Sequence, residues 1–538
     1  MLRRTFLLGA AATAAGCTRS NTLERAQRLY MPGMLEGHVL RDGATLPAAS
    51  HERKTSVAIL GSGVAGLSCA WKLAKQGFHD FVVVAGPEFG GNSAGGGSGD
   101  LAYPRGAHYL PLPSMASTHV REMLADFGVL TRHTHGEHPY YDERAIVHSP
   151  DERVLHNGKW EEGVLPSTGL SVEVSVQHQT FLAEMERLRT LVGADGKKVF
   201  CIPIALSSND PEWRALDALT FKQWLDNNGY TSPGLHWYAS YCCRDDYGAD
   251  YDLISAWAGL HYFASRDGHA ANAADGAVLT WPNGLATLIE KLHAAITRRL
   301  GHSHWRQDGM AMKVTERPGE VQVTCARVTA GSISASTLRA KRVVCATPLF
   351  VASRLLPDIR SYGFDPAIHL PQTAPWLVSN FSLSGYPVEA AGEPLAWDNV
   401  VYRGRGLGYV VSTHQLLRAA PSPRTVFTAY DALSQGSPDS VRRWMMRASP
   451  AELREQASTD LVSAYGRDFW VHATDLEITL RGHGMASPLQ GFLDNRGTAA
   501  LREVDGPVLF AHADLSGYSV FEEASWWGVR AADRILGA

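Results

Sequence analysis

The stretch that decides the fold reads Ser56-Val57-Ala58-Ile59-Leu60-Gly61-Ser62-Gly63-Val64-Ala65-Gly66. A short apolar run leads into three glycines at the G-x-G-x-x-G spacing, and a helical pattern follows them. Gly61 permits a tight turn, Gly63 lets a pyrophosphate approach the backbone, and Gly66 allows the helix to pack closely on the strand. Because phosphates bind the free amides of a helix N-terminus, we expect Gly61, Gly63, Val64, Ala65 and Gly66 to hold a dinucleotide.

A second apolar run, Phe81-Val82-Val83-Val84, follows at the distance expected of a βαβ unit. The sequence therefore predicts a Rossmann-like domain. The acidic residue that normally ends this second strand and binds the ribose hydroxyls is absent, because Ala85 and Gly86 follow Val84. We expect Glu88 to reach the ribose from the loop instead.

Length and composition limit the class of protein. The 538 residues are enough for two domains, and 45% hydrophobic with 19% charged residues is typical of a soluble globular protein. A net charge of −4 argues against nucleic-acid binding, which favours a basic surface.

The cysteines and histidines do not form a metal-binding pattern. Of seven cysteines, Cys242 and Cys243 are adjacent and no C-x-x-C pair occurs, which favours free buried thiols and leaves a disulfide open. His133, His135 and His138 lack a supporting set of carboxylates or cysteines. We expect them to be solvated loop residues and predict no metal site.

The N-terminus has the pattern of a targeting segment. Arg3 and Arg4 precede an apolar run that ends at Gly16, too short to span a bilayer but long enough for a signal peptide. The pair resembles a twin-arginine export signal, and Ala14 to Cys17 resembles a lipoprotein cleavage box in which Ala14 replaces the usual leucine. A periplasmic or other extracytoplasmic location is therefore expected. Lipidation of Cys17, its absence, and an uncleaved anchor helix all remain open.

Two groups of short segments, one after the second strand and one near the C-terminus, add to the pattern of the glycine-rich turn. Gly90-Gly91-Asn92 and Gly106-Ala107-His108-Tyr109 follow the second strand. Near the C-terminus an apolar strand precedes Asp514, then Ser516-Gly517-Tyr518, then a helix from Phe521 to Ala532. Together with the glycine-rich turn, these segments resemble the flavin amine oxidase superfamily. The export signal agrees with FAD, because a tightly held flavin travels with its protein whereas a soluble nicotinamide would need recycling outside the cytoplasm.

The resemblance implies how FAD is bound. Gly90 and Gly91 match the glycine doublet that lines the cofactor, and Asn92 stands where a basic residue is usual. Val314 would lie beside the adenine through its backbone, and Asp514 would bind the ribityl chain. The helix N-terminus at Phe521 and Glu522 would face the N1/C2=O edge of the flavin, where negative charge develops on reduction.

Candidate catalytic residues follow from the same resemblance. Tyr518 is the first candidate for an aromatic wall of the substrate pocket, with a core tyrosine as the alternative. His483 and His108 are candidates for proton transfer or for facing the ring, with structural roles as the alternative. No lysine matches the one that lies beside the flavin in the family, since Lys313 falls next to the predicted adenine strand.

The expected fold is α/β, with a discontinuous Rossmann-like FAD-binding domain and an inserted α+β substrate domain of the amine-oxidase type. The predicted order is a signal (1–17), an irregular lead-in (18–53), three FAD-binding parts (54–111, 271–350, 481–538) and two substrate-domain parts (112–270, 351–480).

The sequence thus predicts an exported FAD-dependent oxidoreductase that oxidises a small amine or polyamine by hydride transfer to flavin, with oxygen or a quinone as electron acceptor. One alternative is desaturation of an apolar substrate, as in desaturases and protoporphyrinogen oxidases, with electrons passed to a quinone. Another is a flavin-bearing binding protein without turnover.

Overall fold

The predicted βαβ unit lies at the centre of the first domain. In the computed structural model, which describes residues 26–329, 331–420 and 422–537, β2 (Glu52–Leu60) runs into α3 (Val64–Lys75), and β3 (Phe81–Val84) returns parallel to β2. Val57 to Leu60 and all of β3 are buried, because both faces of a parallel sheet are covered.

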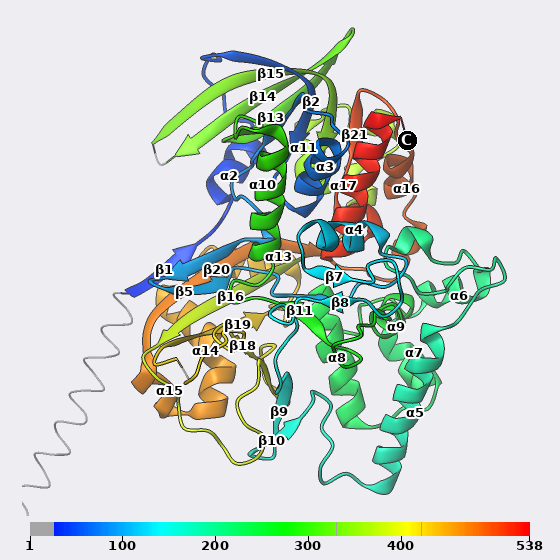
Figure 1. Cartoon of the computed structure of the whole chain (residues 1–538), viewed down its shortest axis with the longest axis vertical. Coiled ribbons are helices and arrows are strands. Elements are labelled where there is room, and N and C mark those ends of the chain that lie inside the picture. Colours follow the sequence, from blue (N-terminus) through cyan, green and yellow to red (C-terminus); the bar gives the residue numbers. More distant parts are fainter. Residues whose placement is uncertain (1–25, 330, 421, 538) are drawn as a thin grey trace, which may run out of the picture.

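The sheet of this nucleotide domain has seven strands (Figure 1). Its order is β12 (Arg306–Gln307), β3, β2, β15 (Ser332–Cys345), β14 (Glu320–Thr329) and β13 (Met310–Arg317), and β21 (Val508–Phe510) also pairs with β15. The long strand β15 is antiparallel to β14 along its first part and parallel to β21 along its last three residues. The C-terminal strand thereby joins the sheet that begins with residue 52, and the discontinuous nucleotide domain is confirmed.

Three helices pack around α3: α17 (Phe521–Leu536), α10 (Ala286–Leu300) and, through Trp71, α4 (Thr118–Asp126). The closest approach is at Gly528 of α17, where an added Cβ would lie 2.1 Å from the carbonyl oxygen of Ala65. Ser68 and Ser525 share a hydrogen bond of 3.2 Å at the same contact. Two helices from opposite ends of the chain are therefore held nearly backbone to backbone.

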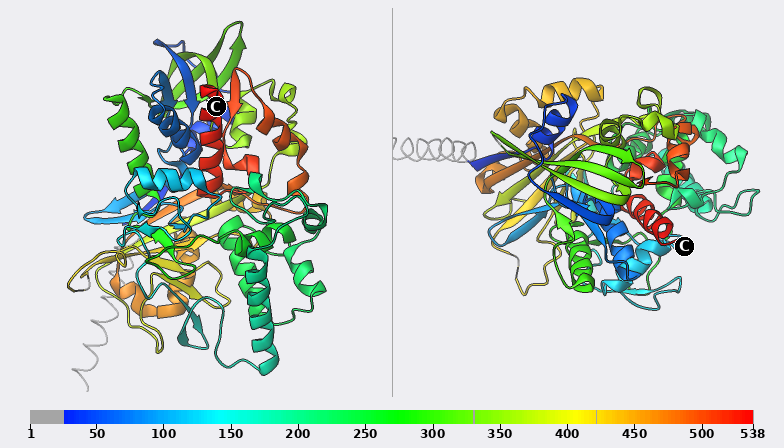
Figure 2. Two further views of the ribbon diagram at one scale, coloured as in Figure 1. Left: turned by 45° about the vertical axis from the view of Figure 1, so that its right-hand side comes forward. Right: turned by 90° about the horizontal axis from the view of Figure 1, so that it is seen from above.

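The second domain is built on an eight-stranded sheet (Figures 1 and 2). Its order is β1 (Gln27–Tyr30), β20 (Ala473–Ala486), β16 (Thr373–Leu383), β19 (Thr425–Asp431), β18 (Tyr409–Val411), β17 (Asp398–Val401), β9 (Glu152–His156) and β10 (Lys159–Glu162). The predicted strands at Trp376 and Tyr409 are confirmed.

Helices cover both faces of this sheet, and every residue of β16 is buried. Trp376 and Val378 face a core shared with α5 (Val172–Arg189), α7 (Phe221–Asn227), α8 (Pro233–Tyr247) and α9 (Ala256–Ala264). Leu377 and Phe381 face a core shared with α13 (Pro438–Met445), α14 (Pro450–Tyr465) and α15 (Arg467–His472). The alternation follows from the two-residue period of a strand.

The remaining elements are short. They are α2 (Met34–Arg41), β4 (Gly95–Ser98), β5 (Leu101–Pro104), β6 (Tyr109–Pro111), β7 (Leu130–Arg132), β8 (Tyr140–Tyr141), α6 (Pro211–Arg214), β11 (Val278–Thr280), α11 (Leu349–Leu355), α12 (Pro366–His369) and α16 (Arg496–Glu503).

The expectation of an irregular lead-in is wrong for the described part of 18–53. β1 pairs parallel with β20, and α2 follows it after Gly33, which takes a left-handed conformation (φ 77°) at the helix start. The proline and glycines of this stretch suggested broken structure, whereas Gly33 begins a helix and β1 obtains its hydrogen bonds from a strand about 450 residues away.

Two segments expected in the substrate domain pack on the core of the nucleotide domain. Met123 and Leu124 of α4 are buried there, and so are Leu355 and Phe364. The predicted domain boundaries near residues 112 and 351 therefore do not coincide with the points where the chain passes from one hydrophobic core to the other.

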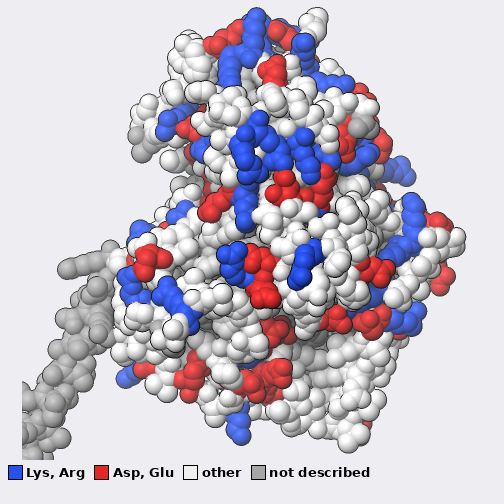
Figure 3. Space-filling model, in the orientation of Figure 1, with Lys and Arg blue, Asp and Glu red and all other residues white. Residues whose placement is uncertain are grey.

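Several other features of the described residues bear on the sequence analysis. Six cysteines are buried and free. His133, His135 and His138 are exposed, and no described group of three His, Cys, Asp or Glu is placed to hold a metal. Within the same residues, no helix has the length and apolar character needed to cross a membrane. Basic and acidic side chains are interspersed on the face in Figure 3.

The contact at Gly528 leads to a stability prediction. Because the added methyl of Gly528→Ala would overlap the Ala65 carbonyl, α17 must move away from α3, at a cost of about 1–3 kcal/mol. We expect a lower midpoint of urea denaturation for this variant. Gly506→Ala is the matched control, since an added Cβ there has no neighbour within 4 Å. Equal midpoints for the two variants would show that the contact does not limit packing.

Candidate active site

A cavity of about 1200 Å³ lies between the two domains and collects most of the predicted site residues. Its walls include the glycine-rich turn, the segment after β3, the middle of β20 and the N-terminus of α17. The volume exceeds the roughly 300–1,000 Å³ of common ligand pockets, as an extended ligand requires. Gly66, Val314 and Tyr518 are predicted site residues that do not line it.

The glycine-rich turn has the geometry of a phosphate cradle. Gly61 has φ 110°, and an added Cβ on Gly66 would lie 2.0 Å from the Gly61 carbonyl oxygen, so both glycines serve the turn and its packing. Gly63 lines the cavity, and its added Cβ would meet nothing within 4 Å. Val64 and Ala65 also line the cavity, at the start of α3. Backbone amides are thus open to a ligand on the cavity side.

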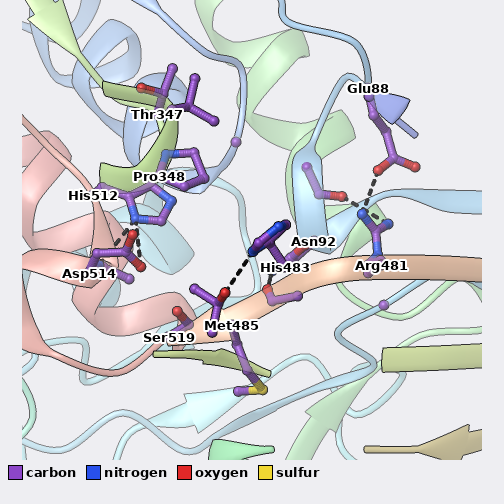
Figure 4. A pocket seen from close by; sticks show the side chains of 18 of the residues that line it. Glu88, Asn92, Thr347, Pro348, Arg481, His483, Met485, His512, Asp514 and Ser519 are labelled. Carbon is purple, nitrogen blue, oxygen red and sulfur yellow. Dashed lines mark hydrogen bonds and ion pairs between the residues drawn. The ribbon is translucent and has the colours of Figure 1, made fainter. Parts of the chain in front are cut away.

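Glu88 lies in the cavity wall, where its carboxylate forms an ion pair with Arg481 of β20 at 2.8 Å (Figure 4). Both side chains are largely buried. Burial and the Glu88 carboxylate raise the pKa of Tyr30 in β1, so this phenol also lies close to the pair. A ribose contact by Glu88 stays a prediction.

The glycine doublet joins the turn to β20. Gly91 lies against the turn, since its added Cβ would lie 3.4 Å from Cα of Gly63. The side-chain amide of Asn92 donates a hydrogen bond to the carbonyl oxygen of Gly484. Asn92 therefore ties the loop to β20 on the cavity wall and does not supply the positive charge that a basic residue would bring.

Val314 is not placed as expected. It is buried in the core of the nucleotide domain, whereas Met310 and Ala311 of the same strand line the cavity. A bulge between Ala311 and Lys313 interrupts the pairing of β13 with β14 and shifts which residues face the cavity. The cavity-lining residue of β13 that is nearest to Val314, Ala311, lies three residues earlier in the chain.

The C-terminal segment supplies the opposite wall. Asp514 is buried; burial raises its pKa, but His512 at 3.2 Å and the backbone amide of Leu349 at 2.8 Å lower it below the ordinary value. Asp514 is therefore a carboxylate at neutral pH. Phe521 and Glu522 line the cavity at the N-terminus of α17, which has no capping side chain, so its first amides are free to face a negatively charged group.

Both candidate histidines line the cavity, but neither is a proton donor at neutral pH. Burial lowers the pKa of His108 to about 3, and its ring packs against Tyr430 with centroids 4.5 Å apart. Burial and the nearby Arg442 lower the pKa of His483 to about 4. His483 stacks on Phe350 and shares a 2.8 Å hydrogen bond with Thr373. In Figure 4 it lies between the Glu88–Arg481 and His512–Asp514 pairs.

The expectation that Tyr518 forms an aromatic wall is wrong. Gly517 turns the chain with φ 87°, and Tyr518 enters the core of the second domain. Its ring contacts Tyr247 and His261, and its hydroxyl donates to Glu523 at 3.0 Å. Tyr518 is the core tyrosine of the alternative interpretation.

The aromatic wall comes from residues that sequence reasoning did not select. Tyr109, Trp376 and Tyr430 line the cavity, from β6, β16 and β19. They lie on strands of the two domains, and strand position alone did not show which residues face the cavity.

Two carboxylates of α8 complete this end of the cavity. Asp246 is paired with Arg266, whereas Asp245 accepts only a 3.4 Å hydrogen bond from Tyr109 among the described residues. Burial and the neighbouring Asp246 raise the pKa of Asp245 to about 7. Two adjacent acids inside a largely buried helix are the sequence signal that could have indicated this site.

Lysine does not occur in the lining formed by the described residues, and Lys313 is exposed on β13. The cavity therefore contains the cradle for a dinucleotide, a helix N-terminus at its far side and an aromatic, acidic end that has no lysine among the described residues.

Comparisons with known proteins agree with this arrangement. The model of the flavin-containing amine oxidoreductase family matches residues 64–536. Solved structures with the same fold include putrescine oxidase bound to putrescine (15% identity, TM-score 0.62, covering 90% of this chain and 100% of that one). Cyclohexylamine oxidase from Brevibacterium oxydans IH-35A is also similar (18%, 0.59, 90% and 99%), as is a fatty acid isomerase from P. acnes that produces CLA (16%, 0.56, 89% and 98%). No curated protein matches.

The family match covers most of the chain and includes the glycine-rich turn from Val64, the glycine doublet and the C-terminal helix. The open backbone at Gly63, the buried Asp514 carboxylate and the uncapped start of α17 fit FAD. The chain is an FAD-dependent oxidoreductase that belongs to the flavin-containing amine oxidoreductase family.

Proposed function

We propose that this protein oxidises a small amine with a second positive charge, such as a diamine or polyamine. The observation that carries the proposal is Asp245, a carboxylate in the cavity wall without a cationic partner of its own among the described residues. Asp245 is partly buried, and removing its charge from water without a cationic partner is costly, so a ligand ammonium group would offset that cost. Aromatic faces beside it favour the same kind of ligand through cation–π attraction.

Two further carboxylates lie near Asp245. Burial and the Asp245 carboxylate hold the pKa of Asp398 of β17 well above its usual range. Glu152 is exposed at the start of β9, opposite Asp398 in the sheet, and its charge also raises the pKa of Asp398. Neither Asp398 nor Glu152 lines the cavity, so they add negative potential behind Asp245 and make no contact with a ligand there.

The residues of the cavity have distinct roles in this proposal. Bound FAD would accept the two electrons from the carbon beside the amine nitrogen. Tyr109, Trp376 and Tyr430 exclude water and orient the amine, and Asp245 holds its distal ammonium group. His108 and His483 are neutral at physiological pH and act through packing and hydrogen bonds. Oxygen or a quinone is the electron acceptor in this proposal.

The substrate class can be tested by anaerobic titration of the purified holoprotein. We expect a diamine such as putrescine, or a polyamine such as spermidine, to bleach the flavin absorbance, and cyclohexylamine to do so less readily. If no amine reduces the flavin, the proposal is overturned. Rapid reduction by an apolar substrate, followed by reoxidation with a quinone, would then support desaturation, and a flavin that stays oxidised with every donor would support a binding protein.

The role of Asp245 predicts a pH dependence. Because its pKa is about 7, the carboxylate is mostly protonated at about pH 6 and mostly ionised at about pH 8, so a fixed cation should bind about tenfold more tightly at the higher pH. A bis-quaternary alkane diammonium ion is the probe, because its charge does not change with pH. Its Kd is measured from the perturbed flavin spectrum.

Asp245→Asn should remove this pH dependence and weaken binding at about pH 8 by tenfold or more, at least about 1.4 kcal/mol. Asp308→Asn is the control, because Asp308 is exposed and does not line the cavity. This variant should change neither the Kd of the probe nor its pH dependence. A pH dependence that survives in Asp245→Asn would place the titrating group elsewhere.

We further propose that the protein is exported by the twin-arginine route with FAD bound and is tethered through Cys17. The paired arginines and the cleavage-box pattern support this proposal; both lie outside the described residues. Replacing both Arg3 and Arg4 by lysine should keep the flavoprotein in the cytoplasm of a host that has the route. Cys17→Ser should move it from the membrane to the soluble periplasmic fraction. Export of the double-lysine variant at the normal level would contradict the first part.

A further inference from the structure

Residues 27–41, here called the N-terminal strap, form part of the cavity wall. The strap consists of β1, a turn at Met31 to Gly33, and α2. It precedes the first residue matched by the family model, so the family match does not account for it. In Figure 1 it connects the two domains, because β1 lies on the lower sheet and α2 lies beside the upper one.

The first half of the strap is fixed to the second domain. β1 pairs with Leu476 to Thr479 of β20 over its full length, and Arg28 forms an ion pair with Asp475 at 2.9 Å. The guanidinium group of Arg105 lies over the ring of Tyr30, 4.3 Å from its centroid. These contacts hold the segment that leads into α2.

The second half is fixed to the nucleotide domain. Val39 and Leu40 of α2 pack against a small cluster that contains Met310 and Met312 of β13. Gly33 lies close to the segment after β3, since its added Cβ would be 3.0 Å from Cγ of Pro87. α2 therefore spans from the end of β3 to β13.

This position coincides with one end of the cavity. The strap residues in the wall are Met31, Pro32, Gly33, Met34, Gly37, His38, Leu40 and Arg41. Around the same end lie Val84 to Glu88 and Met310 with Ala311. In a dinucleotide-binding fold, the end of the second strand contacts the ribose of the adenosine half. The strap thus covers the region where the adenosine of FAD would bind.

Gly37 is an independent indication of a ligand here. It lies inside α2, where glycine costs about 1 kcal/mol relative to alanine. No protein atom requires it, because an added Cβ would meet nothing within 4 Å and its φ is not left-handed. Gly37 lines the cavity, as does Gly63 of the glycine-rich turn, whose added Cβ is equally free. A close approach of ligand to the helix backbone explains a glycine at this position.

The strap also compensates for a missing group. The carboxylate that would hold the ribose at the end of β3 is absent, and Glu88 is already paired with Arg481. Met34 and Leu40 offer apolar surface to an adenine, and His38 offers ring nitrogens that can exchange hydrogen bonds with hydroxyl groups.

We propose that the strap is the outer wall of the adenosine half of the FAD site and controls how long the cofactor stays bound. Release of FAD then requires α2 to move away from β13 and the turn at Gly33 to leave Pro87. The proposal concerns cofactor retention and is independent of which substrate is oxidised.

Hydrogen exchange tests the position of the strap. Addition of FAD to the apoprotein should slow exchange of the amides of both the glycine-rich turn and α2, whereas FMN, which lacks the adenosine, should leave α2 unchanged. Protection of the turn without protection of α2 would overturn the proposal. Absence of protection at both would overturn it together with the assignment of FAD to this cavity.

Gly37→Leu tests the same contact by filling the space beside the helix. We expect its Kd for FAD, measured by quenching of flavin fluorescence, to rise at least about tenfold, and its Kd for FMN to stay within about twofold. Leu35→Phe is the matched control, because Leu35 is exposed on the same helix and does not line the cavity. Equal midpoints of thermal unfolding for the two apoproteins show that the variants fold. Unchanged FAD binding in Gly37→Leu, or equal weakening of FAD and FMN, would contradict the proposal.

Discussion

The close contact between α3 and α17 is the constraint on which the rest of the structure depends. Gly528 lies against the Ala65 carbonyl, so the helix after the glycine-rich turn and the last helix of the chain are packed directly on each other. Their N-termini, at Val64 and Phe521, both line the cavity. Because each helix N-terminus carries partial positive charge, the contact brings two sites for negative groups to one ligand. A cofactor that joins phosphates to a reducible ring fits this pair.

The charged side chains that line the cavity differ in whether another protein group is paired with them. The Glu88 carboxylate is paired with Arg481, and the Asp514 carboxylate accepts a hydrogen bond from the Leu349 amide, whereas Asp245 has no cationic partner of its own among the described residues. Burial keeps both lining histidines, His108 and His483, neutral. Asp245, which lies beside Tyr109, is therefore a cavity carboxylate that titrates near neutral pH and has no cationic partner among the described residues. The unpaired Asp245 carboxylate is the reason for proposing that the substrate is a cationic amine.

The strap and the aromatic end lie at different parts of the same cavity. One covers the region expected for the adenosine, and the other contains Asp245 and the ring side chains. Retention of the cofactor and choice of substrate can therefore change independently.

By itself, the sequence determined the Rossmann-like domain, its glycine-rich turn, the cofactor and the return of the C-terminus to the same sheet. These features depend on backbone geometry. Gly61 and Gly66 are needed because no side chain fits there, and a turn with this requirement appears in the sequence as glycines at a fixed spacing. Only the tertiary structure decided which side chains face the cavity. On β13, which has a bulge between Ala311 and Lys313, Ala311 lines the cavity and Val314 does not, and the turn at Gly517 placed Tyr518 in the core. β1 and Asp245 likewise became informative only through distant partners, because a strand's hydrogen bonds and a buried acid's surroundings come from segments far away in the chain.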